Sequence, residues 1–191
     1  MPPKKDKAPE LPIVVMGSGA VGKSCLAVQY QHSIFEEHDY DPTIEDNHRK
    51  EEELADGRTY CLNIRDTAGE PEFIGLLENA IEEGEGFMIV YSIIDKRSFE
   101  EVVGFMELIQ KKKGGEEVPI MLVGNKCDCE SERVTTTEQG QSLAKHYGIT
   151  FFETSAKTGE QVKACFISIA ERVKESMLKS GKIKDKNCTL M

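Results

Sequence analysis

Short apolar runs alternate along the chain with longer stretches that carry apolar residues at three- and four-residue steps. The short runs have strand length, and the longer stretches have the spacing of amphipathic helices. Strands are predicted over residues 12–16, 59–65, 86–92, 119–124 and 150–153. Helices are predicted over residues 23–32, 72–82, 97–112, 136–147 and 160–178. This alternation is typical of an α/β sheet with crossover helices.

The last of these helices has the clearest pattern. Its apolar residues fall on one face, at Val162, Phe166, Ile169, Val173 and Met177. We expect that face to pack on the sheet. Thr135, just before the helix predicted at 136–147, and Glu138 within it resemble a capping box that would open the helix.

The segment 45–54 lacks apolar alternation, and its propensity alone would favour a polar helix or a loop. Asp56-Gly57 follows it, however, and is a hairpin turn signal that leads into the strand beginning at Thr59. A strand at the edge of the sheet, with charged residues on its exposed side, reconciles the two observations.

The length of 191 residues suits one domain with a sizeable core. We divide the chain into a disordered leader at 1–10, a folded domain at 11–178 and a basic flexible tail at 179–191. The leader lacks the apolar region of a secretory signal, and no apolar stretch approaches the roughly 20 residues of a membrane span.

Charge is distributed unevenly along the chain. The net charge is −10, whereas residues 174–191 carry five lysines against two acidic residues. The acidic body argues against a general nucleic-acid surface and suits basic partners, while the basic tail suits an anionic membrane. The six cysteines lack the paired spacing of a zinc site, and we expect reduced thiols in a cytosolic compartment.

Residues 17–24 read GSGAVGKS, between a predicted strand and a predicted helix. Gly17 and Gly22 allow the backbone to turn its N–H groups toward a polyphosphate, Lys23 brings a charge to the outer phosphates, and Ser24 offers a hydroxyl to Mg²⁺. The predicted phosphate site comprises Gly17, Ser18, Gly19, Ala20, Val21, Gly22, Lys23, Ser24 and Cys25.

Two later motifs indicate which base is bound. Asn125-Lys126-Cys127-Asp128 follows a buried strand, and the Asp128 carboxylate can accept from both the ring N–H and the exocyclic amine of guanine. Lys126 can lay its stem on the base. In the motif Ser155-Ala156-Lys157, the Ala156 backbone N–H can reach the guanine carbonyl. Adenine lacks that pair of donors, so these motifs disfavour an ATP-using kinase.

Asp66-Thr67-Ala68-Gly69-Glu70 lies at the end of a predicted strand. Asp66 can hold Mg²⁺ through a water, and the Gly69 N–H can meet the γ-phosphate of a nucleoside triphosphate. An aspartate that merely ends a strand is the alternative for this segment alone.

With these motifs in order, the chain resembles the Ras family of small GTPases, in its Ras and Rap branch, from residue 11 to the C-terminus. The resemblance implies a single P-loop NTPase domain: a six-stranded, mostly parallel sheet with one antiparallel strand on its edge side, flanked by five helices. It also implies a monomeric GDP/GTP switch in signal transduction that hydrolyses GTP with Mg²⁺.

The resemblance assigns roles by position. Thr43 would join Ser24 on Mg²⁺ when the γ-phosphate is present, Phe35 would pack on the base, and Tyr40 would close over the phosphates. The catalytic group would be Lys23, Thr43, Gly69 and Glu70. The effector segment would be Tyr40, Asp41, Pro42, Thr43, Ile44, Glu45, Asp46, Asn47 and His48. Expected partners are effectors with basic surfaces, a guanine nucleotide exchange factor and a GTPase-activating protein.

The chain departs from the family at several positions. Asn47 and His48 stand where Ras proteins carry a small hydroxyl residue and an aromatic, and Glu70 stands where the family has a glutamine that orients the attacking water. A carboxylate accepts from water but has no amide to donate to the γ-phosphate. A GTP-binding adaptor with slow turnover is therefore the alternative function.

The chain ends Cys188-Thr189-Leu190-Met191, a prenylation box in which Met191 favours farnesyl. The upstream lysines would supply the second signal that a single lipid needs for stable binding. We expect a protein anchored by lipid to the cytoplasmic face of a membrane, the plasma membrane.

Overall fold

The computed structural model describes residues 7–35 and 45–184. Within these ranges, six strands form one sheet in the order β2-β3-β1-β4-β5-β6. β2 runs antiparallel to β3, and every other neighbouring pair is parallel. The prediction of a mostly parallel sheet with one antiparallel edge strand is confirmed. The strands are β1 (Glu10–Met16), β2 (Glu45–Glu53), β3 (Thr59–Thr67), β4 (Gly86–Ser92), β5 (Ile120–Asn125) and β6 (Thr150–Thr154).

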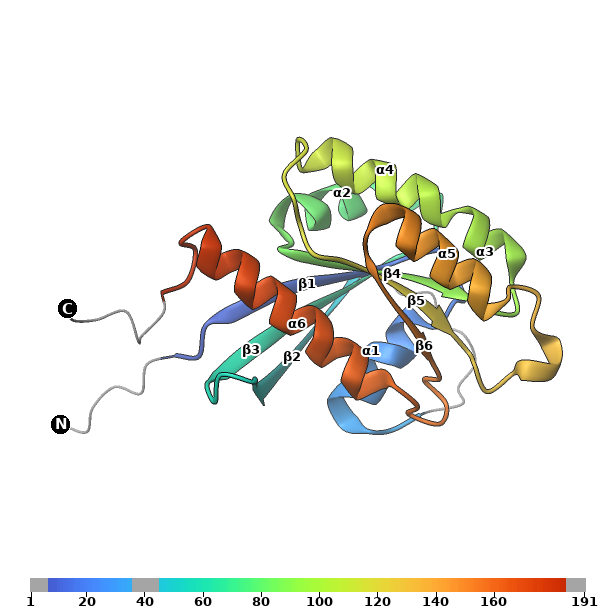
Figure 1. The fold of residues 1–191 in the computed structure, drawn as a ribbon, viewed down its shortest axis with the longest axis horizontal. Helices are drawn as coiled ribbons and strands as arrows, with labels where there is room; N and C mark the ends of the chain where they lie inside the picture. The colour runs from blue at the N-terminus through green and yellow to red at the C-terminus, as the bar shows by residue number, and fades with distance from the viewer. Residues whose placement is uncertain (1–6, 36–44, 185–191) are drawn as a thin grey trace.

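Helices cover both faces of the sheet, with α1 and α6 on one face and α2 to α5 on the other (Figure 1). They are α1 (Lys23–His32), α2 (Ile74–Glu83), α3 (Lys96–Glu100), α4 (Val102–Lys112), α5 (Thr137–Tyr147) and α6 (Val162–Lys179). Short 3₁₀ turns occupy Pro71–Phe73 and Glu130–Glu132. Among the described residues, no helix is long and apolar enough to cross a membrane.

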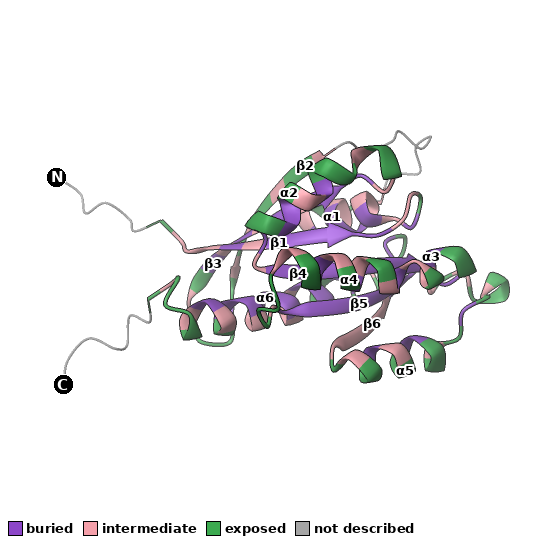
Figure 2. Ribbon diagram, turned by 90° about the horizontal axis from the view of Figure 1, so that it is seen from above, coloured by how far each residue is buried: buried purple, intermediate pink, exposed green. Residues whose placement is uncertain are grey.

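Alternating side chains of β1 divide the core into two layers. Ile13 and Val15 belong to the layer under α1 and α6, whereas Val14 and Met16 belong to the layer under α2, α4 and α5. Every residue of β4 and β5 is buried, as the purple ribbon in Figure 2 shows, so these central strands are covered on both faces of the sheet. The apolar face predicted for the last helix is buried along its whole length in α6.

β2 forms although its sequence lacks apolar alternation, and two of its inward-facing polar side chains make hydrogen bonds to α1. His48 Nδ1 lies 2.7 Å from Gln31 Oε1. Lys50 donates to the Tyr30 carbonyl at 2.8 Å, with its amine 4.5 Å from the Tyr30 ring centroid. The predicted turn follows β2, with Gly57 at φ 72°. The edge-strand interpretation of 45–54 is therefore confirmed.

The capping box was predicted one residue too early. Thr136, not Thr135, caps α5: the Thr136 hydroxyl accepts from the Gln139 N–H at 3.2 Å, and Gln139 Oε1 accepts from the Thr136 N–H at 2.8 Å. Thr135 is buried, and its N–H donates to the Ile93 carbonyl at 3.1 Å. That contact with the end of β4 holds Thr135 outside the helix.

The helix predicted at 97–112 is interrupted at Glu101, where α3 ends and α4 begins. The N-terminus of α3 is capped by Asp95, whose carboxylate accepts from the Arg97 N–H at 3.0 Å. β1 begins at Glu10 and α6 ends at Lys179.

Candidate functional site

Four of the predicted motifs meet at one edge of the sheet. Residues 17–24, 66–70, 125–128 and 155–157 lie at or just after the carboxyl ends of β1, β3, β5 and β6. These strands are parallel, so their carboxyl ends share an edge. The strand order reverses direction around β1, and ligands of open α/β sheets bind outside such a point.

At the two ends of the loop at 17–22, no residue other than glycine fits. Gly17 has φ +143°, and a Cβ there would lie 2.1 Å from the Val90 carbonyl oxygen. Gly22 has φ +95°, and its Cβ would lie 2.4 Å from Asn125 Nδ2. The backbone can therefore turn tightly against β4 and the base motif, as a phosphate-binding loop requires.

Lys23, the first residue of α1, is folded back over this loop. Its Nζ donates to the carbonyls of Gly17 at 2.9 Å and Ser18 at 2.8 Å, and the residue is only 6% exposed. Burial lowers the pKa of the Lys23 amine, and the negative charges of Asp66 and Glu70 oppose that shift. A desolvated cation held at the loop is suited to bind an anion.

Ser24 and Asp66 form a hydrogen-bonded pair of side chains in the site. The Ser24 hydroxyl donates to Asp66 Oδ2 at 2.5 Å. Asp66 is fully buried, and burial raises the pKa of its carboxyl to about 6, against the opposing effects of Ser24 and Lys23. Its other oxygen, Oδ1, is buried with no hydrogen-bond partner in the described part of the chain.

Ser24 and Asp66 fit Mg²⁺. A buried carboxylate with an unused acceptor oxygen is stabilised by a cation, and Mg²⁺ prefers oxygen ligands. Ser24 and Asp66 would hold it. Residues 7–35 and 45–184 contain no group of three or more His, Cys, Asp or Glu that could bind a metal. Mg²⁺ commonly takes one or two protein ligands together with phosphates and waters, so the small donor set is consistent with it.

Asn125 connects the phosphate loop to the base motifs. Its Nδ2 donates to the Val21 carbonyl at 2.9 Å. Its Oδ1 accepts from Thr154 Oγ1 at 3.3 Å and from the Ala156 N–H at 3.2 Å. Asn125 is 1% exposed, so its hydrogen bonds link three loops from a buried position. The Ala156 N–H, which we expected to face the guanine carbonyl, donates one of these bonds to Asn125.

Lys126 and Asp128 are held at the rim of the site. Lys126 has φ +68°, and its Nζ donates to the Ala20 carbonyl at 2.9 Å. Asp128 Oδ1 accepts from the Ser155 hydroxyl at 2.6 Å, and Ser155 Oγ accepts in turn from the Thr158 N–H at 3.0 Å. The carboxylate that we expect to select guanine is therefore oriented by a serine.

The remaining residues predicted for the nucleotide site differ in how far they are buried. Cys25 is half-buried, and burial raises the pKa of its thiol. Phe35 is partly buried against the core under α1 and α6. Lys157 is exposed. Tyr40, Asp41, Pro42, Thr43 and Ile44 lie outside the described residues, as does Cys188.

Gly69 packs directly on the phosphate loop. A Cβ on Gly69 would lie 2.3 Å from the Gly19 nitrogen and 2.5 Å from the Ser18 carbonyl carbon, so only glycine fits. Its N–H donates to Glu70 Oε2 at 3.1 Å. Pro71 follows Glu70 and opens the 3₁₀ turn before α2.

Glu101 is a site-adjacent residue that the sequence did not indicate. Its carboxylate accepts from the Ser18 hydroxyl at 2.5 Å and from Arg97 Nε at 2.9 Å. The hydrogen bond from Ser18, followed by the Arg97 contact and charge, outweighs partial burial and lowers the pKa of Glu101. The phosphate loop is thus tied to the interruption between α3 and α4, a contact that no local pattern predicts.

The described part of the effector segment lies on β2, at the edge of the sheet. Asp46 and Asn47 are exposed, whereas Glu45 and His48 are partly buried. Arg65 Nε lies 3.5 Å from a Glu45 oxygen.

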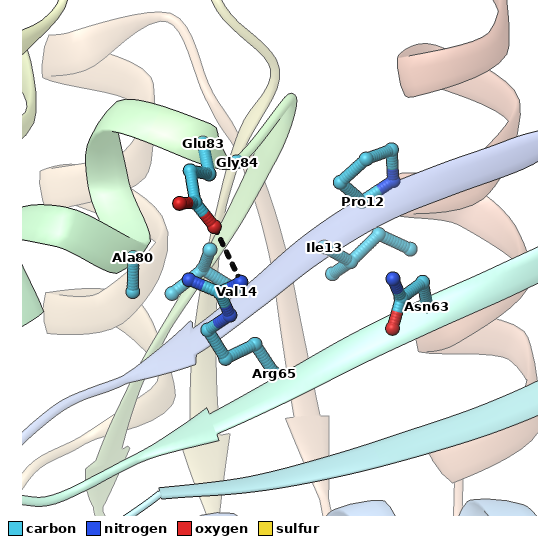
Figure 3. Close-up of a pocket in the computed structure, with 8 residues that line it drawn as sticks. All are labelled: Pro12, Ile13, Val14, Asn63, Arg65, Ala80, Glu83 and Gly84. Atoms are coloured by element: carbon cyan, nitrogen blue, oxygen red, sulfur yellow. Dashed lines mark hydrogen bonds and ion pairs between the residues drawn. The ribbon is translucent and has the colours of Figure 1, made fainter.

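A small pocket lies between α2 and the strands β1 and β3, with a cavity volume of about 130 Å³ (Figure 3). An ion pair of 2.6 Å between Arg65 and Glu83 spans it. Its lining is Pro12, Ile13, Val14, Asn63, Arg65, Ala80, Glu83 and Gly84. None of these belongs to the nucleotide motifs, so the pocket is separate from the candidate nucleotide site.

Comparison with protein families matches residues 12–175 to the Ras family. The match covers most of the chain and includes all four motifs at the sheet edge. This chain therefore belongs to the Ras family of small GTPases, whose members bind guanine nucleotides with Mg²⁺ and act as molecular switches.

We predict that Asp128→Asn weakens the binding of GDP and GTP by several kcal/mol. The substitution places a donor amide against guanine donors, and each unmatched buried polar group costs about 1 to 3 kcal/mol. Affinities measured by nucleotide competition check this, with Glu132→Gln as a control because it removes an exposed charge nearby. Wild-type affinity in Asp128→Asn would exclude Asp128 from base recognition.

Proposed function

We propose that this protein is a GTP-hydrolysing switch of the Ras and Rap branch that acts in signal transduction. The observation that carries the proposal is the pair of buried, oppositely charged groups, Lys23 and Asp66, at the end of the phosphate loop. A Mg²⁺ nucleotide would complement both charges at once, with the phosphates facing Lys23 and the cation facing Asp66.

Each residue would have a separate task in that complex. Lys23 neutralises the outer phosphates, the Ser24 hydroxyl and Asp66 hold the cation, and Asp128 accepts from guanine. Bound Mg²⁺ supplies charge neutralisation on the phosphates. The Gly69 N–H would donate to the γ-phosphate, and Thr43 would join Ser24 on the cation in the GTP form only.

The alternative function, a GTP-binding adaptor with slow turnover, is favoured by Glu70. Its carboxylate is engaged with the Gly69 N–H at 3.1 Å, and it has no amide to donate to a phosphate oxygen. It would also compete with the γ-phosphate for an arginine supplied by an activating protein. The two functions differ in the rate of hydrolysis, not in the nucleotide bound.

We expect Glu70→Gln to raise activator-stimulated GTP hydrolysis at least several-fold. Glutamine restores one donor group and removes the charge that competes for the arginine. Single-turnover hydrolysis with and without an arginine-supplying activating protein measures the effect. Glu72→Gln is the matched control, since Glu72 is exposed and two residues away. Identical responses of wild type and Glu70→Gln would show that this position does not set the cycle time.

Effectors would bind along β2, the edge of the sheet. An edge strand offers backbone groups for addition of a partner strand, and the acidic Glu45 and Asp46 suit a partner with basic side chains. Exchange factors and activating proteins would contact the region around α2, where Ile74 and Leu76 are 49% and 38% exposed. Leu77, beside them, is buried in the core.

Attachment to the cytoplasmic face of the plasma membrane would combine a farnesyl group on Cys188 with the lysines that precede it. Among these, Lys179, Lys182 and Lys184 are exposed at the end of α6 and beyond it. Lys182 lies 2.7 Å from Glu85, a contact that binding to anionic lipid would have to replace. One lipid chain alone binds membranes marginally, and each lysine near the surface adds about 1 kcal/mol.

Cys188→Ser is predicted to remain wholly soluble in cells that prenylate proteins. Replacing Lys179, Lys182, Lys184 and Lys186 by glutamine should weaken attachment while leaving prenylation intact. Fractionation of membranes and cytosol measures both variants, and Cys61→Ser, on β3 and outside the nucleotide motifs, serves as the cysteine control. Retention of Cys188→Ser on membranes would show that another anchor exists.

A further inference from the structure

Glu70 makes a contact that bears on which nucleotide the site favours. The Gly69 N–H donates to Glu70 Oε2 at 3.1 Å, so the side chain folds back on the backbone of its own neighbour. Gly69 in turn lies against the phosphate loop, where a Cβ would be 2.7 Å from the Gly19 Cα. The carboxylate is therefore bonded to a backbone group that packs on the loop.

The charge of Glu70 also acts on Lys23. Burial lowers the pKa of the Lys23 amine, and the carboxylates of Asp66 and Glu70 act in the opposite direction. The Glu70 carboxylate thus accepts a hydrogen bond from the Gly69 N–H and also acts through its negative charge on the Lys23 amine. These are the two donors that a terminal phosphate would need in the function proposed above.

We propose that the Glu70 carboxylate is an internal substitute for the γ-phosphate and makes the site selective for GDP over GTP. The proposal rests on the proposed function, since it assumes that Lys23 and Gly69 face the third phosphate. GDP leaves the contact between Glu70 and Gly69 in place. GTP must displace it and must then bind near a carboxylate of the same charge sign.

The local backbone allows this contact without strain. Glu70 has an extended conformation, with φ −87° and ψ 138°, which is the region that a following proline favours. A hydrogen bond to a carboxylate is stronger than one between neutral groups, so its loss on GTP binding is costly. Neutral glutamine at this position would bond the same N–H more weakly and would not repel phosphate.

The test compares the affinities of GDP and of a non-hydrolysable GTP analogue, both with Mg²⁺, in four proteins. These are the wild type, Glu70→Gln, Glu70→Ala and the control Glu72→Gln. Affinity for the analogue relative to GDP should rise at least about tenfold in Glu70→Gln and Glu70→Ala, because a charge-assisted hydrogen bond no longer has to be broken. The control should keep the wild-type ratio.

An unchanged ratio in both Glu70 variants would overturn the inference, as would an equal change in the control. Those outcomes leave the proposed function intact, because GDP affinity is measured separately in each protein. Failure of wild type to bind either guanine nucleotide would instead refute the proposed function, and this inference with it. The measurement involves no turnover, so it is independent of the part that Glu70 has in hydrolysis.

Discussion

The site depends on two opposite charges that the fold removes from water where β1 and β3 end. Lys23 is 6% exposed and Asp66 is fully buried. Burial lowers the pKa of the Lys23 amine and raises the pKa of the Asp66 carboxyl to about 6, so both groups are costly in their charged forms. Their contacts with loop carbonyls and the Ser24 hydroxyl offset only part of that cost. A phosphate and a cation would complete the arrangement.

The sheet brings the other parts of the site to these charges. Asn125 bonds the phosphate loop through Val21 and the last loop through Ala156, so the phosphate and base regions form one connected unit. Glu101 accepts a further hydrogen bond from Ser18 of the same loop. Glu70 stands where the family has a glutamine. It places a third charge beside Gly69, in a region that is suited to bind anions. Hydrolysis and nucleotide preference are therefore both expected to depend on that residue.

Most of the fold follows from local sequence, because buried strands and amphipathic helices have distinct periods, and motifs after parallel strands must share an edge. Even β2 was predictable from the turn at Asp56-Gly57. The errors arise where distant contacts decide. Thr135 is held outside α5 by the Ile93 carbonyl, and the break at Glu101 coincides with its bond to Ser18. The bond between the Ala156 N–H and Asn125 was also not predictable, because it depends on the packing of two loops, and the role of Ala156 toward guanine stays a prediction.

The most direct test of this account is the thermal stability of wild type and Asp66→Asn, each without nucleotide and with Mg²⁺·GDP. Because the pKa of Asp66 is raised in the fold, its contribution to stability falls as the pH rises from about 4 to about 6, and at pH 7.5 the ionised carboxylate destabilises the empty protein. Asp66→Asn should therefore be more stable than wild type when empty and should gain much less from Mg²⁺·GDP. Equal stability when empty and an equal gain with the ligand would contradict the account.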